Sequence, residues 1–346
     1  MVSASDGASA TVDGMQQAAT ILNNSLESSA PAPAGEQKPT KQELKTLTDG
    51  VKLEASKIGL MWASSQPSPA EAQSLFTALE HRHSQLFTLL CRAGYGGGPT
   101  LLQSLQSVAA PVTEACTHIV KYVSSTKILP EGQAAKQVAK VWAACDAAST
   151  ACLDNKTAIG RRLLHISRSV KDNIRELQEV IVESQACSHS SGAQTVSDDA
   201  NSEVDLDFEA DAMSPVELEL AESSLPLLQV VLDVFKLLIR ILLTEDIVSE
   251  ASTLDDWERL LFHAKGLADV SNDLGAALFA PQDAGEVTSA ADSLNTGCEL
   301  VFDEVPDHLK DGHAEPIESL VVRLADAHTG IHDKVSADVS GLTISS

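Results

Sequence analysis

The chain has 346 residues, which is enough for two domains because single hydrophobic cores rarely grow beyond roughly 250 to 300 residues. Aromatic residues make up only 3% of it while Ala and Leu are abundant, which disfavours sandwiches and barrels and predicts an all-α protein. The formal net charge is −25, and residues 187–346 alone hold 7 Lys and Arg against 32 Asp and Glu. Such a surface repels nucleic acid and anionic lipid, so neither is an expected partner and a basic protein surface fits better.

Cysteine use and hydropathy indicate an intracellular protein without a membrane anchor. The six cysteines form no C-x-x-C pair and lack the density of a secreted disulfide scaffold, which predicts reduced thiols. The first residues lack the basic and apolar regions of a signal peptide, so none is expected. The apolar run from Leu225 to Leu243 is interrupted by Asp233, Lys236 and Arg240, which favours a buried bundle helix over a membrane span.

The first half of the chain shows helical spacing of apolar residues between turn signals. Thr40 and Glu43 form a capping box at the start of one helix, and Ser68 followed by Pro69 marks the start of the next. The stretch GYGGGP, residues 94–99, then breaks the chain. The predicted helices are residues 11–26, 40–63, from 69 to the break at 94, 100–124 and 133–152.

The clearest amphipathic helix is predicted over Asn155 to Glu183. Its apolar residues recur at spacings of 4, 3, 4, 4, 3 and 4 from Ile159 to Ile181, and the resulting seam must be covered by other helices. We interpret this helix as the second piece of a fifth helical region. The first bundle, of about five helices, is therefore expected to span residues 1–186.

An acidic segment follows this helix. Residues 197–211 contain seven acidic side chains and no basic ones, without a helical apolar pattern. We interpret residues 187–212 as a flexible, solvated linker between two helical bundles. Thr195 and Ser202 each have an acidic residue three positions later, as acidophilic kinases prefer, so they are candidate phosphorylation sites. A linker that only adds solubility is the alternative.

Residues 213–346 form the predicted second bundle, which is acidic and, like the first bundle, antiparallel. Apolar residues from Leu225 to Leu242 recur at spacings of 3 and 4, and the neighbouring faces are also apolar, so this helix is expected at the centre of the bundle. The pattern predicts main helices at 218–243, 254–279, 283–305 and 316–339, with 213–223 as a fifth helix in one interpretation.

No stretch has the pattern of an active site, so neither an enzyme nor a cofactor is predicted. GYGGGP lacks the lysine of a phosphate-binding loop and follows a helix rather than a strand. His328 and His332 are four residues apart on one helix face with an acidic residue nearby, but no third ligand is expected in range. We interpret the pair as part of a solvated helix face, with no metal site. His81 and His83, two residues apart, are also expected at the surface.

Several short sequence motifs, which we call landmarks, follow one another along the chain. The most specific are Val141-Trp142 followed by Asp154-Asn155-Lys156, and the helix start Pro67-Ser68-Pro69. The wider stretches are MWASSQPSPAEAQSLF at 61–76, VWAACDAASTACLDNKTAIGRRLL at 141–164, VKDNIRELQE at 170–179, the acidic segment, and LDDWERLLFHAKGLADVSNDLGAALFAP at 254–281. Together they resemble the cyclin-D-binding protein family, whose members are also described as Id-like helix-loop-helix proteins.

The resemblance implies a fold and a role. The family fold is all-helical, with two bundles in the style of vinculin and catenin modules. Its members are not enzymes; they bind D-type cyclins and helix-loop-helix transcription factors, and they act as negative regulators of cell-cycle progression and transcription. A similar role in nucleus and cytoplasm is expected here, for a monomer that docks its partners on a closed surface. A structural scaffold related to cytoskeletal adaptor modules is the alternative.

Two sets of residues are candidates for partner binding. The first set comes from the landmarks and comprises Trp142, Asp154, Asn155, Lys156, Arg161 and Arg162. The second set comes from the acidic segment and comprises Asp198, Asp199, Glu203, Asp205 and Asp207.

Overall fold

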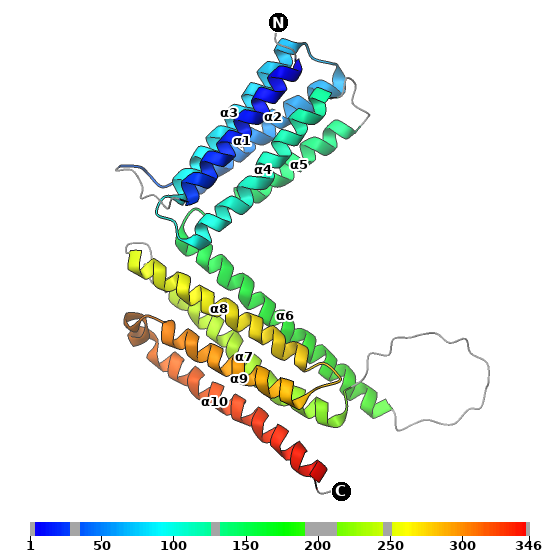
Figure 1. The fold of residues 1–346 in the computed structure, drawn as a ribbon, viewed down its shortest axis with the longest axis vertical. Coiled ribbons are helices and arrows are strands. Elements are labelled where there is room, and N and C mark those ends of the chain that lie inside the picture. Colours follow the sequence, from blue (N-terminus) through cyan, green and yellow to red (C-terminus); the bar gives the residue numbers. More distant parts are fainter. Residues whose placement is uncertain (1–3, 28–34, 126–131, 191–212, 245–250, 344–346) are drawn as a thin grey trace, which may run out of the picture. The chain divides into compact units, whose positions relative to one another are not determined.

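The computed structural model describes residues 4–27, 35–125, 132–190, 213–244 and 251–343. Every regular element in these residues is an α-helix, and the chain divides into two compact units, residues 1–159 and 160–346 (Figure 1). The predicted all-α fold with two bundles is therefore confirmed.

The described residues of the first unit form a bundle of five helices that share one apolar core. Within it, α1 packs against α3 and α4, α2 packs against α3 and α5, and α4 also packs against α5. The helices are α1 (Ala4–Glu27), α2 (Lys41–Ser64), α3 (Pro69–Gly94), α4 (Pro99–Ser125) and α5 (Gln133–Ser149).

Reciprocal side-chain bonds fix the starts of α2 and α3; the pair at α2 and the cap residue of α3 were predicted. The hydroxyl of Thr40 accepts a hydrogen bond from the backbone N–H of Glu43 at 3.1 Å, and the Glu43 carboxylate accepts one from the Thr40 N–H at 2.7 Å. Ser68 and Glu71 form the same pair at the start of α3, with Pro69 at its first position. Each capping box satisfies backbone donors that the helix itself leaves free.

In the part of the second unit that the structure describes, five helices are grouped around α7. As its apolar residues predicted, α7 is buried on most of its faces, and it packs against α8, α9 and α10. It continues through Pro226, so residues 213–223 are not a separate helix. The helices are α6 (Asn155–Ser190), α7 (Pro215–Thr244), α8 (Ala251–Ala277), α9 (Ala284–Glu304) and α10 (Asp307–Thr343), the last with a kink at His313.

The helix α6 belongs mostly to the second unit, which corrects the predicted bundle of residues 1–186. The chain passes between the units within α6, between residues 159 and 160. Asn173 Nδ2 of α6 donates to the Ser271 carbonyl of α8 at 2.8 Å, and a methyl group added to Gly160 would lie 3.1 Å from Leu242 Cδ2 of α7. The apolar seam is buried as predicted, but its spacing does not reveal which helices cover it.

The acidic segment connects two neighbouring helices of the second unit, which corrects its interpretation as a linker between bundles. At its two ends, the backbone N–H of Met213 donates to Ser184 Oγ at 3.4 Å, and Gln185 Nε2 of α6 donates to Glu222 Oε1 of α7 at 2.6 Å. Residues 191–212 lie outside the described part of the chain. The candidates that fall there are Thr195, Asp198, Asp199, Ser202, Glu203, Asp205 and Asp207.

The structure also bears on the predicted surface position of His83, on the cysteines and on membrane spans. His83 is fully buried in the first unit, not at the surface, because residues two apart on a helix point to different sides and this one faces the core. None of the described cysteines forms a disulfide bond. None of the described helices combines the length and the hydropathy that crossing a bilayer requires.

Candidate functional site

Trp142 on α5 is a large aromatic residue that leaves 47% of its surface exposed. Its indole N–H donates to Ser56 Oγ of α2 at 3.1 Å, and the Lys52 ammonium lies 5.6 Å from the ring centroid. Lys52 in turn contacts the carboxylates of Asp49 and Asp146, each at 2.8 Å. The ring is thus held in one orientation by contacts from α2 while its outer face remains open.

The sequence of α5 creates a shallow surface beside this ring. Ala135, Ala139 and Ala143 recur every four residues and line up on one face of α5. Gly59 on the opposing helix α2 has no side chain, so the two helices approach closely there: a methyl group added to it would run into Val138. The small side chains leave a mainly apolar hollow of about 610 Å³, which we call the α2–α5 groove.

The rim of the α2–α5 groove combines apolar and charged groups. Leu60 of α2 leaves 71% of its surface exposed on this rim. The hydrogen bonds that the Lys52 ammonium donates to Asp146 and then Asp49 raise the pKa of Lys52, so its ammonium stays charged at neutral pH. Cys145, on another face of α5, is buried, and burial raises the pKa of its thiol to about 12. The groove therefore offers apolar area and a fixed charge cluster, but no activated nucleophile from this cysteine.

The other landmark candidates have structural partners away from the α2–α5 groove. Asp154 caps α6, because its carboxylate accepts hydrogen bonds from the backbone N–H of Thr157 at 2.7 Å and from its hydroxyl at 2.8 Å. Asn155 ties the turn before α4 to α6: its Oδ1 accepts from the Gly98 N–H at 2.9 Å and its Nδ2 donates to the Gly96 carbonyl at 3.3 Å. Gly96 needs its glycine because φ is +65°.

Three more landmark residues lie near the start of α6. Lys156 is half-buried, while Arg161 and Arg162 are exposed on the first turns of this helix. None of them lines the α2–α5 groove. Their contribution to partner binding stays a prediction.

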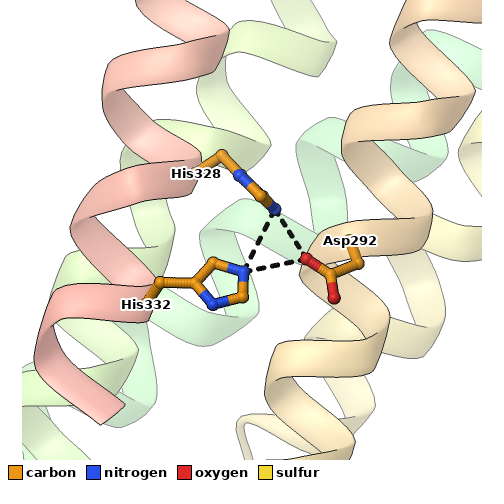
Figure 2. Close-up of side chains that lie close together, drawn as sticks. All are labelled: Asp292, His328 and His332. Carbon is orange, nitrogen blue, oxygen red and sulfur yellow. Dashed lines mark hydrogen bonds and ion pairs between the residues drawn. The ribbon is translucent and has the colours of Figure 1, made fainter. Parts of the chain in front are cut away.

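A second group of functional side chains lies between α9 and α10. Asp292 Oδ1 of α9 is 2.7 Å from His328 Nε2 and 2.8 Å from His332 Nε2, and the two imidazole nitrogens of α10 are 3.3 Å apart (Figure 2). Hydrogen bonds from His328 and His332 lower the pKa of the Asp292 carboxyl. We call these three residues the His2Asp cluster.

The structure corrects the expectation that the histidine pair has no third ligand in range. Asp292 is separated from His328 by 36 residues in sequence, and only the packing of α9 against α10 brings them together. The i,i+4 spacing found two members of the His2Asp cluster, but no local pattern identifies the third. By contrast, the alanine repeat of α5 is visible in the sequence and indicates a helix face of small side chains. That this face forms a groove follows only from the position of α2 opposite it.

Comparisons with known proteins identify the family. A search of curated proteins returned no match to this chain. The family model described as Grap2 and cyclin-D-interacting, N-terminal, matches residues 43–183, and its C-terminal counterpart matches residues 196–303. The first match covers α2 from residue 43 onward and all of α3 to α5, and so includes the α2–α5 groove, and the second contains Asp292. Because the two matches cover most of the chain, the protein belongs to the Grap2 and cyclin-D-interacting protein family.

Proposed function

We propose that this protein is a non-enzymatic regulator that binds a D-type cyclin through the α2–α5 groove. The family description names cyclin D as a partner of the family, which supports this choice of ligand. The observation that carries the site is Trp142, a half-exposed tryptophan held in place at the edge of an apolar groove. Tryptophans of this kind dominate the binding energy of many protein interfaces.

The shape of the groove favours an amphipathic helix as the bound element. Two antiparallel helices with small residues between them form a channel in which a third helix can place its apolar side chains. Leu60 and Trp142 would contact that helix from both sides, and each would bury apolar area that is now exposed to water. Asp146 at the rim, together with its ion-pair partner Lys52, would fix the register of charged groups on the partner.

We extend the proposal to the cellular role. Binding of a D-type cyclin, and of helix-loop-helix transcription factors, would make the protein a negative regulator of cell-cycle progression and transcription, acting as a monomer in nucleus and cytoplasm. Docking on a closed surface is favoured over opening of a bundle. The seam of α6 from Ile159 to Ile181 is buried, and its exposure would sacrifice about 1.5–3 kcal/mol for each large apolar side chain.

A binding assay with designed variants tests this proposal. The full chain is titrated against a purified D-type cyclin by isothermal calorimetry, with Trp142→Ala, Ala139→Glu and a deletion of residues 187–211 in parallel. Trp142→Ala removes the apolar anchor, and Ala139→Glu places a charge inside the α2–α5 groove. Each is expected to weaken binding by about tenfold or more, as for interface hot spots, whereas the deletion should leave the affinity unchanged.

Phe262→Ala is the matched control, because Phe262 is also a large exposed apolar residue, with 74% of its surface accessible, but lies on α8. Circular dichroism of each variant checks that the fold is intact. Equal affinity of Trp142→Ala and the original chain would show that the groove is not the binding site, and loss on deletion alone would move it to the acidic segment. Absence of any cyclin binding would overturn the proposal as a whole.

A further inference from the structure

The His2Asp cluster brings three potential metal-binding atoms to one point between two helices. His328 and His332 stand one turn apart on α10 and direct their Nε2 atoms toward α9, where Asp292 Oδ1 faces both (Figure 2). All three ligand atoms lie within 4.8 Å of one another. The side chains are 24%, 39% and 54% exposed for His328, His332 and Asp292, so an ion can reach them from solvent.

The spacing of these atoms is close to that of a tetrahedral metal site. Zinc bonds of about 2.0–2.1 Å at tetrahedral angles would place neighbouring ligand atoms about 3.3–3.4 Å apart. The two imidazole nitrogens are already 3.3 Å apart. The carboxylate oxygen lies about 0.6 Å closer to them than this, and a small rotation of the half-exposed Asp292 side chain would open that distance.

The donor set selects a class of ion. Two imidazoles and one carboxylate suit zinc and similar divalent transition metals, whereas calcium and magnesium prefer sites made of oxygen ligands. The net charge of this half of the chain also favours a cation: residues 160–346 contain 12 Lys and Arg against 36 Asp and Glu, a net charge of −24. From this geometry and charge we infer that the His2Asp cluster binds one divalent transition-metal ion of the zinc type, which clamps α10 to α9.

The site leaves room for one more ligand. Three protein ligands complete only part of a tetrahedral shell, so the fourth position is open to water. Because Asp292 comes from α9 and both histidines come from α10, a bound ion would cross-link two helices that now meet here through hydrogen bonds. Metal binding should therefore stabilise the second unit against unfolding, by mass action on the folded state.

Calorimetry of the full chain, with any histidine tag removed and metal stripped by a chelator, tests the inference. Titration with zinc chloride is expected to show one ion per chain, and Co2+ in its place should give the intense visible bands of a tetrahedral complex. His328→Ala and Asp292→Asn should each lower the zinc affinity at least tenfold, since changes in the outer shell alone typically cost 10- to 100-fold. Asp292→Asn keeps the shape of the side chain and removes only its charge.

His81→Ala is the matched control, because His81 is an exposed histidine of α3 that lies outside the His2Asp cluster. This variant should bind zinc as the original chain does. Differential scanning calorimetry with and without zinc adds a second measurement, in which the increase in Tm is expected for the original chain and lost in His328→Ala. Binding of less than one ion per chain, or equal weakening in all three variants, would overturn the inference.

Discussion

His83 is a buried histidine in the core of the first unit. Its Nε2 pairs with Thr113 Oγ1 at 3.0 Å and its ring stacks on Phe87 at a centroid distance of 4.0 Å, while Nδ1 has no partner among the described residues. Burial lowers the pKa of His83 to about 4 from its ordinary value of 6.5. The ring is therefore neutral in the folded protein at any pH near neutrality.

This pKa predicts a loss of stability in mild acid. Between pH 6.5 and 4 the unfolded chain binds a proton at His83 that the folded chain does not, so stability falls as the pH is lowered through this window. The contribution amounts to about 2 kcal/mol between pH 7 and pH 5. Urea unfolding at both values should show this decrease in the original chain and a smaller one in His83→Phe. An identical decrease in both proteins would refute the assignment, and His81→Ala serves as the exposed control.

Asp154 predicts a second effect at the residue scale. Asp154→Ala removes the cap of α6 and should lower the free energy of unfolding by about 1 kcal/mol, whereas Asp154→Ser keeps a capping oxygen and should lose much less. Urea unfolding of both variants measures the difference. If alanine and serine behave alike, the bonds to Thr157 do not stabilise the helix.

Local chemistry made some residues predictable and left others out of reach. The capping box at Thr40 and the cap at Ser68 were predicted because a cap depends only on residues a few positions apart in sequence. Asp292 was not predicted as a ligand, and His83 was placed at the surface, because both depend on which helix lies opposite. The landmark residues Asp154 and Asn155 were found, but their contacts are structural ones that the resemblance did not specify.

At the scale of elements, the close approach of α2 and α5 at Gly59 predicts a pair of opposite glycine effects. Gly59→Ala introduces a methyl group against Val138, and overpacking of about 1–3 kcal/mol should exceed the gain of about 1 kcal/mol in helix propensity. Gly266 of α8 has open space around it, so Gly266→Ala should instead stabilise the protein by about 0.5–1 kcal/mol.

Urea unfolding measures both glycine variants. The double variant Gly59→Ala with Val138→Ala removes the clashing methyl groups and should recover part of the loss. If Gly59→Ala stabilises the protein as much as Gly266→Ala does, α2 and α5 are not as close as the structure places them.

The positions of helices were more predictable from the sequence than the helices they pack against. The spacing of apolar residues located α6 and α7 and predicted which faces are buried, because periodicity is a property of one helix. Periodicity did not show that α5 and α6, which lie on either side of residue 153, belong mostly to different units. Nor could it show that α2 lies opposite the alanine face of α5, so the α2–α5 groove required the structure.

At the scale of the whole molecule, the position of the division predicts how fragments behave. Fragment 1–159 contains the complete first core, including Ala158. Fragment 1–186 adds most of α6 without the helices that cover its seam, and each uncovered apolar side chain forgoes about 1.5–3 kcal/mol of burial. We expect fragment 1–159 to be a folded monomer and fragment 1–186 to self-associate.

Size-exclusion chromatography with light scattering, together with circular dichroism, distinguishes these outcomes. The complementary fragment 155–346 should fold, whereas 213–346, which lacks α6, should aggregate. Monomeric behaviour of both 1–186 and 213–346 would mean that α6 belongs to the first unit after all.

The contact between Ser184 and Met213 changes how a signal in the acidic segment could act. Modification of a segment that joins two bundles could change the distance between the bundles. The acidic segment instead connects α6 to α7 within the second unit, and the two units are joined within α6, so its modification would not change that distance. The length of the acidic segment can also vary with little effect on stability, because doubling the length of a closed loop adds only about 0.6 kcal/mol to the entropic cost of closing it. A phosphate group on Thr195 or Ser202 would thus act through its negative charge on a bound partner, rather than by changing the arrangement of the two units.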